Sequence, residues 1–169
     1  VATTAQQPAV TLSKEHEASA QQPAVTLSTE HEAFITGNSG EAIADSGCRC
    51  AVAGQAWHTA MQEELKRKGM TWHEEKESET FRFGSGDPET SNTAYIYPVG
   101  IYGKNDLVRM SCVGGGALPC PGLVGPSELS RWGAVARFQD RTLELKGKVR
   151  PMKLTYTRHP AIDLMERSE

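Results

Sequence analysis

The hydrophobic pattern separates a polar first part of the chain from a longer patterned part. Residues 5–18 and 20–33 form a direct repeat that is rich in Gln, Ala, Ser, Thr and Glu. These repeats contain almost no large apolar side chains, so they cannot bury enough surface to offset the entropy lost on ordering. We therefore predict a disordered linker over 1–33, a folded domain over 34–149, and a polar tail or linker over 150–169.

Short apolar runs bounded by glycine-bearing turns predict β-strands within the folded domain. The runs lie at 34–35, 42–44, 80–83, 94–102, 107–113, 135–138 and 142–145. The segment 80–102 contains a glycine-rich tip at 84–88 and is typical of a β-hairpin. The charged segment 73–79 is expected to form a loop.

Two segments have the spacing of helices instead. Trp57, Met61 and Leu65 fall four residues apart, which predicts a helix over 53–68 that ends at Gly69. A second, short helix is expected between Ser127, its predicted N-cap, and Gly133. The pattern as a whole predicts a mostly β domain with two helices.

Composition and charge narrow the classes of partner. The 169 residues are 38% hydrophobic and carry a formal net charge of −3, without a strongly basic stripe. We therefore expect no nucleic acid to bind through this domain. No apolar run is long enough to cross a bilayer, and no signal-peptide pattern opens the chain, so we expect no membrane partner and an intracellular, cytoplasmic location.

The cysteines and histidines are residue types that bind zinc, but their pattern does not favour a zinc site. The spacing of Cys48, Cys50, Cys112 and Cys120 matches no common zinc framework, so we expect free thiols in or near the core and no metal or other cofactor. His58 and His73 could be combined with Cys48 and Cys50, but an exposed helix histidine and a loop histidine are the simpler interpretation. The three tryptophans are expected to anchor the core rather than stack on bases.

The candidate chemistry lies where the apolar run Ala42-Ile43-Ala44 meets Asp45-Ser46-Gly47. Alone, this acid at a strand end is typical of a surface turn. Downstream, however, lie a hairpin with the glycine-bearing tip Gly84-Ser85-Gly86, and then Leu123-Val124-Gly125 followed at once by a short helix. The order of these three features makes Asp45 a candidate catalytic residue.

This order resembles the retropepsin family, the aspartic proteases of retroviruses and retrotransposons, over about residues 34–149. The phrase Phe81-Arg82-Phe83-Gly84-Ser85-Gly86 and the helix inserted after the acid look more like the proteases of copia-type retrotransposon polyproteins. The resemblance implies a closed β-barrel with a flap hairpin, an inserted helix after the catalytic loop and a short C-terminal helix. It also implies an aspartic endopeptidase that processes a polyprotein and is active as a homodimer.

The resemblance assigns a role to each matching residue. One Asp per subunit is implied, because two adjacent carboxylates that share a proton can activate water and polarise the scissile carbonyl. The implied catalytic residues are Asp45, Ser46 and Gly47; the implied contacts to an extended peptide are Cys48, Ser85 and Gly86; and the implied supports of the catalytic loop are Leu123, Val124 and Gly125.

Three features depart from the family pattern. Cys48 stands where a small residue is usual, Arg49 stands where retroviral members often carry an acid, and the helix over 53–68 enlarges the loop after the acid. They leave an alternative open, a catalytically inactive retropepsin-like module of a decayed element that dimerises or binds peptides. A monomeric remnant without a function of its own is a third interpretation.

Overall fold

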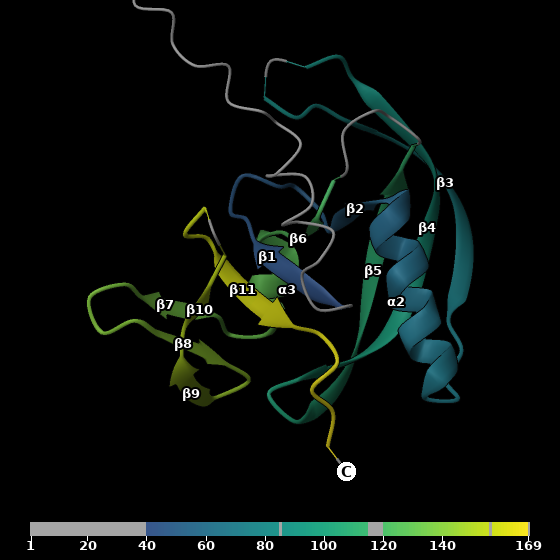
Figure 1. The fold of residues 1–169 in the computed structure, drawn as a ribbon. Helices are drawn as coiled ribbons and strands as arrows, with labels where there is room; N and C mark the ends of the chain where they lie inside the picture. The colour runs from purple at the N-terminus through teal and green to yellow at the C-terminus, as the bar shows by residue number, and fades with distance from the viewer. Residues whose placement is uncertain (1–39, 85, 115–119, 156, 169) are drawn as a thin grey trace, which may run out of the picture.

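The computed structural model describes residues 40–84, 86–114, 120–155 and 157–168 (Figure 1). The linker expected over 1–33 and the strand expected at 34–35 lie outside these residues. The helices are α2 (Gln55–Arg67) and α3 (Pro126–Arg131). The strands are β1 (Glu41–Ala44), β2 (Val52–Gly54), β3 (His73–Phe81), β4 (Glu89–Ile101), β5 (Lys104–Val113), β6 (Gly122–Val124), β7 (Val135–Arg137), β8 (Thr142–Leu145), β9 (Lys148–Pro151), β10 (Lys153–Leu154) and β11 (Pro160–Asp163).

The strands form two open sheets, so the domain is mostly β as predicted but the expected closed barrel is wrong. The larger sheet has the order β10-β11-β1-β6-β2-β5-β4-β3, and the smaller one has the order β7-β8-β9. In the described part of the chain, no pairing joins the outer strands β3 and β10. The sheet stays open because its two outer strands are poorly suited to pair with each other. Strand β10 has only two residues, and β3 carries several exposed charges, which suit a strand edge that faces water.

The charged segment 73–79, expected as a loop, is instead most of strand β3. It pairs antiparallel with β4, with an irregularity between Lys76 and Glu79. Arg109 of β5 lies 3.0 Å from the Glu75 carboxylate and 2.7 Å from that of Glu77, and so offsets the charge of the strand. Strand pairing rather than apolar content therefore decides the conformation of this segment.

The described residues of 150–169 also differ from the predicted polar tail, because they contribute strands to both sheets. Strand β11 pairs antiparallel with β1, with Ala42 opposite Ile162. Ile162 is 1% exposed and Leu164 is fully buried. The apolar stretch is short and lies among polar residues and prolines, so only the partner strand β1 reveals it as core.

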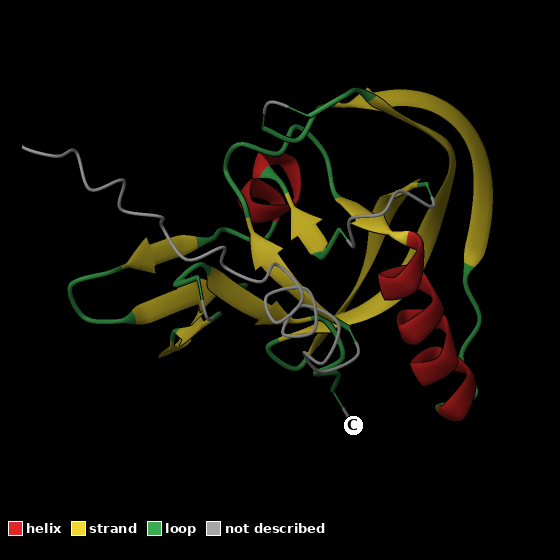
Figure 2. Cartoon of the chain, turned by 45° about the horizontal axis from the view of Figure 1, so that its top comes forward, coloured by secondary structure: helices red, strands yellow, loops and turns green. Residues whose placement is uncertain are grey.

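Helix α2 begins two residues later than predicted, because Val52–Gly54 is used as strand β2. Met61 and Leu65 are fully buried as expected, and Gly69 has a φ of +68° that ends the helix. The half-buried Trp57 donates its indole N–H to the Glu41 carbonyl oxygen at 2.7 Å. The helix lies against β2 and β5, as Figure 2 shows.

Helix α3 begins differently from its prediction. Ser127 is not the N-cap, because the helix starts at Pro126 and the Gly125 backbone occupies the cap position. The Ser127 hydroxyl instead contacts the Glu128 carboxylate at 2.7 Å. Gly133 ends the helix with a φ of +62°, as expected. Proline suits the first helical position, since its missing N–H is one of the groups left unpaired in any case.

Asp106 ties the smaller sheet to the main core. Its carboxylate lies 2.5 Å from Arg131 and 2.6 Å from Lys146, and it accepts the indole N–H of the buried Trp132 at 3.1 Å. Burial acts to raise the pKa of Asp106, but the bonds from Lys146, the Leu107 amide and Arg131 lower it to about 2. The β8–β9 turn is thereby fixed to β5 and to the end of α3.

His58, expected to be an exposed helix residue, is fully buried. Its Nε2 lies 3.1 Å from the Ser111 carbonyl oxygen, which can only accept, so Nε2 carries the proton. Nδ1 therefore accepts from the Tyr97 hydroxyl at 2.8 Å, and that hydroxyl accepts from Gln62 at 3.0 Å. This network holds a neutral imidazole between α2, β4 and β5.

The buried imidazole predicts a pH-dependent stability. Burial lowers the pKa of His58 from 6.5 to about 4. The unfolded chain therefore takes up the proton first as the pH falls, and the stability present above pH 6.5 declines down to about pH 4, by about 3 kcal/mol. Urea unfolding at several pH values measures this slope. His58→Gln is expected to flatten it and the exposed His159→Gln to leave it unchanged; equal slopes in all three proteins would contradict the assignment.

Candidate active site

Two sequence features that lie about eighty residues apart meet in the larger sheet. Strands β1 and β6 run parallel, with Ile43 opposite Leu123 and Ala44 opposite Val124. Just beyond the strand end, the Asp45 amide donates to the Val124 carbonyl oxygen at 3.0 Å. The candidate acid is therefore fixed by its backbone against the Leu123-Val124-Gly125 segment.

The loop after β1 holds the Asp45 carboxylate at the surface. The Gly47 amide donates to Asp45 Oδ1 at 2.8 Å, and the Cys48 amide donates to the Asp45 carbonyl oxygen at 3.2 Å. Asp45 is half-buried, whereas Ser46 and Gly47 are exposed. The carboxylate is thus oriented by one backbone N–H and keeps access to solvent, the arrangement that a general base for water needs.

Gly125 allows the loop and β6 to come together. A Cβ atom at this position would lie 2.2 Å from the Cys48 carbonyl oxygen, which is closer than any real side chain tolerates. The carbonyl oxygen of Gly125 accepts a hydrogen bond from the Leu129 amide at 3.0 Å, and this bond begins the first turn of α3. Val124 beside it is fully buried. Val124 and Gly125 therefore contact the loop of the acid, whereas Leu123 lies opposite Ile43 of β1 and Val52 of β2.

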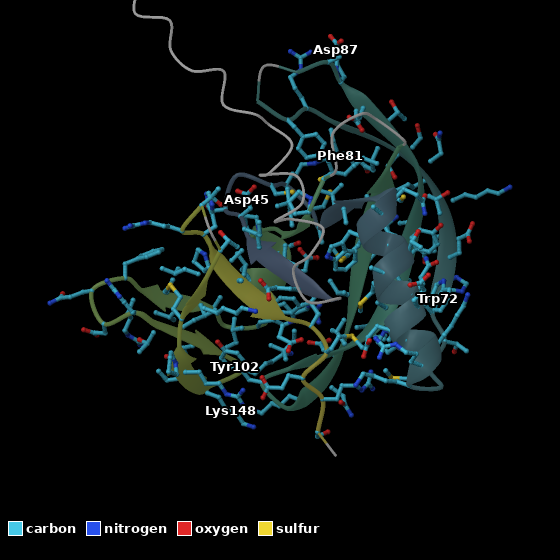
Figure 3. The ribbon with its side chains drawn as sticks, viewed as in Figure 1. Asp45, Trp72, Phe81, Asp87, Tyr102 and Lys148 are labelled. Carbon is cyan, nitrogen blue, oxygen red and sulfur yellow. The ribbon has the colours of Figure 1, made fainter. Side chains whose placement is uncertain are left out.

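A small apolar cluster connects this loop to the hairpin. Its buried members are Val52, Phe81 and Val113, and its half-buried members are Cys48, Cys50, Cys120 and Leu123. Phe81 is the last residue of β3, so the base of the β3–β4 hairpin packs on the residues that follow the acid. Figure 3 shows Asp45, Phe81 and Asp87 in the upper half of the view, with Tyr102 and Lys148 in the lower half.

The hairpin itself is confirmed between β3 and β4, with Phe81 opposite Glu89. Its tip bends where Gly84 has a φ of +56° and where the Gly86 amide donates to the Phe83 carbonyl oxygen at 3.0 Å. Ser85, an expected substrate contact, lies outside the described residues. Phe83 is exposed and stacks on Phe81 with the ring centroids 6.2 Å apart.

The cysteines are free and half-buried, as expected for thiols near the core. Burial, with a smaller contribution from the negative charge of Asp45, raises the pKa of Cys48 to about 11. Burial likewise raises the pKa of Cys120 to about 12. Cys48 donates its S–H to the Cys50 carbonyl oxygen at 2.8 Å. A neutral thiol next to the acid is a packing group rather than a nucleophile.

One contact near the site was not foreseen from the sequence. Arg49 lies 2.5 Å from the Glu79 carboxylate and links the loop after the acid to β3. Both side chains are well exposed, so the pair contributes little to stability. In the sequence, Arg49 is only a departure from the family pattern, and no local signal connects it to a residue thirty positions away.

The histidines that were weighed as possible zinc ligands lie apart. His58 is bonded to Tyr97 and Ser111 inside the core, whereas His73 is exposed at the start of β3. In the described part of the chain, no three His, Cys, Asp or Glu side chains are arranged to hold a metal ion. None of the described helices has the length and apolar character needed to cross a membrane.

Comparison with known proteins returns no match to a family model, to a curated protein or to a solved structure. A function for this chain is therefore inferred from the geometry of the Asp45 loop and from the resemblance in motif order.

Proposed function

We propose that this chain is an aspartic endopeptidase that acts as a homodimer and processes a retrotransposon polyprotein. One observation carries the proposal: Asp45 directly follows β1 and donates its amide to Val124 of the parallel strand β6, with its carboxylate oriented by the Gly47 amide and accessible to solvent. Gly125 lets the Cys48 carbonyl oxygen approach β6 closely, which supports a fixed position for the loop that carries the acid.

The chemistry requires a second carboxylate, supplied by Asp45 of another copy. Two carboxylates within hydrogen-bonding distance cannot both ionise, so they share one proton and titrate as a pair. The ionised Asp45 takes a proton from water, and the protonated one donates to the oxygen of the scissile carbonyl. The tetrahedral intermediate then collapses as the leaving nitrogen gains the proton taken from water.

The requirement for two copies follows from the chain itself. It contains no second Asp-Ser-Gly or Asp-Thr-Gly. Asp106, the aspartate with the strongly lowered pKa, is already engaged by Arg131 and Lys146. Ser46 and Gly47 are exposed at the tip of the loop, where a second copy would meet them.

The substrate in this proposal is an extended peptide held between the Asp45 loop and the β3–β4 hairpin. Phe81 and Cys48 share one apolar cluster, so the base of the hairpin lies next to the acid's loop. The glycines of the tip permit movement, and the hairpin would act as a flap. Main-chain hydrogen bonds to an added strand would give affinity, while Cys48, Ser85 and Gly86 would contact the peptide.

Mixing active and inactive subunits tests the shared site. Wild-type protein is equilibrated with an equal amount of Asp45→Asn protein, and cleavage of a fluorogenic peptide library is measured at mildly acidic pH. Because only dimers of two wild-type copies are active, the rate is expected to fall to about one quarter of that of the same total amount of wild type. A rate of about one half would mean that each copy works alone and would contradict the proposal.

A further inference from the structure

We propose that a groove lined by Phe138, Arg141, Met152, Leu154 and Arg158 binds an extended acidic peptide segment that also carries an apolar side chain. The groove is open to solvent and encloses about 360 Å³, which suits a few side chains of a peptide. It lies outside the Asp45 loop and the hairpin. The inference goes beyond the proposed function and does not require that the chain cleave anything.

The groove lies on the side of the sheet where β10 forms the edge. The pairing of Ile43 with Ala161 sets β1 and β11 antiparallel, so the turn before β11 lies at the end of β1 where Asp45 follows. Arg158 belongs to that turn. The Met152 amide donates to the Arg141 carbonyl oxygen at 2.7 Å, which brings the β7–β8 turn to the same place. A peptide in the groove would therefore lie near the end of the sheet that carries the acid.

The charge of the groove is unbalanced. Within the described residues, neither Arg141 nor Arg158 has an ion-pair partner or a hydrogen bond from its guanidinium group. The neighbouring cations are each paired with a carboxylate: Arg137 with Glu144, Arg150 with Glu166, and Lys153 with Glu41. Among the described residues, Arg141 and Arg158 are thus the cations available to a ligand, and guanidinium groups bind carboxylates through paired hydrogen bonds.

Both arginines have an uncommon backbone conformation. Arg141 has a φ of +51° and Arg158 a φ of +64°, in the left-handed region that favours glycine and asparagine. The Arg158 amide donates to the Thr155 carbonyl oxygen at 2.9 Å, which closes its turn. A long, charged side chain at two such positions in one groove indicates a role for the side chain, since the backbone alone would be better served by another residue.

The exposed apolar side chains of the groove are the reason why the proposed peptide carries an apolar side chain as well as acidic ones. Phe138 is 64% exposed and Leu154 is 39% exposed, although both are large apolar side chains. Nonspecific binding to nucleic acid depends on a row of cations along the phosphates, whereas this groove offers two beside an aromatic ring. An acidic and apolar peptide satisfies the guanidinium groups and the exposed Phe138 together.

The test measures binding rather than cleavage, in the Asp45→Asn background, so that its failure is separate from a failure of the proposed function. The probe is a fluorescein-labelled peptide of residues 28–37, Ser-Thr-Glu-His-Glu-Ala-Phe-Ile-Thr-Gly, followed by fluorescence anisotropy at low and high salt. We expect saturable binding that weakens with salt. The Arg141→Asn/Arg158→Asn double variant is expected to bind about tenfold more weakly or worse.

Asparagine tolerates a positive φ, so this double variant is expected to melt at the wild-type temperature or above it, which separates lost binding from lost folding. Arg137→Gln, outside the groove, serves as the matched control and is expected to bind normally. Equal affinity for the double variant and the control would overturn the proposal. It would also be overturned by equal affinity for a peptide with glutamine at both glutamate positions, or by tighter binding of a single-stranded oligonucleotide.

Discussion

Asp45→Asn is expected to abolish peptide cleavage, lowering kcat/KM by about 10³-fold or more, while the chain remains folded. The amide that replaces the carboxylate neither takes a proton from water nor passes one to the leaving nitrogen. Its side-chain oxygen can still accept the Gly47 amide, which now bonds to Asp45 Oδ1 at 2.8 Å. The substitution therefore removes the proton transfers and retains the hydrogen bond that orients the loop.

The measurement is the rate of cleavage in the fluorogenic library, alongside the melting temperature and the sedimentation behaviour. Asp87→Asn, an exposed aspartate at the tip of the hairpin, is the matched control and is expected to cleave nearly as well as the wild type. Cleavage by Asp45→Asn at the wild-type rate would rule out the proposed chemistry. A folded dimer that binds peptides but is inactive even with Asp45 intact would favour the noncatalytic module instead.

Gly125→Ala is expected to destabilise the fold by about 2–4 kcal/mol. The added methyl group would lie 2.2 Å from the Cys48 carbonyl oxygen and 3.2 Å from the carbon of that carbonyl. Backbone atoms cannot rotate away as a side chain can, so either β6 or the loop after Asp45 must shift. Because the Asp45 amide is bonded to Val124, that shift would also disturb the acid.

Urea unfolding of the wild type and the variant gives the change in free energy. Gly114→Ala is the control, since a Cβ atom there meets no atom of the described residues within 4 Å and the residue has no positive φ. It is expected to change the stability by less than about 0.5 kcal/mol. If Gly125→Ala were as stable as this control, the close approach of β6 to the loop would be incorrect.

The buried histidine restricts the pH range in which these experiments are informative. A pair of carboxylates that share a proton works best where one of them is ionised, which favours acidic conditions. Acidic conditions lower the stability of the fold, however. The pKa of His58 is about 4 in the folded protein, so the free energy of unfolding declines below pH 6.5. Loss of activity at low pH should therefore be separated from unfolding by measuring both on the same samples.

Features with a local signal were predictable from the sequence alone. The strand just before Asp45 follows from Ala42-Ile43-Ala44, most of α2 follows from the spacing of Met61 and Leu65, and the hairpin follows from its glycine-rich tip. The left-handed Gly69 and Gly133 ended the helices where expected. Each is a matter of periodicity or backbone freedom within a few residues, which does not depend on what lies across the sheet.

Only the tertiary structure decided which segments lie beside which. The parallel pairing of β1 with β6, the use of β11 as the neighbour of β1, and the open edges of the sheet are all contacts between distant residues. The burial of His58 depends on Tyr97 and Ser111, and the groove depends on two turns that meet beside β10. A polar strand such as β3, or a short apolar run such as β11, carries no periodic signal of its own. Its conformation is determined by hydrogen bonds and packing with a partner far along the chain.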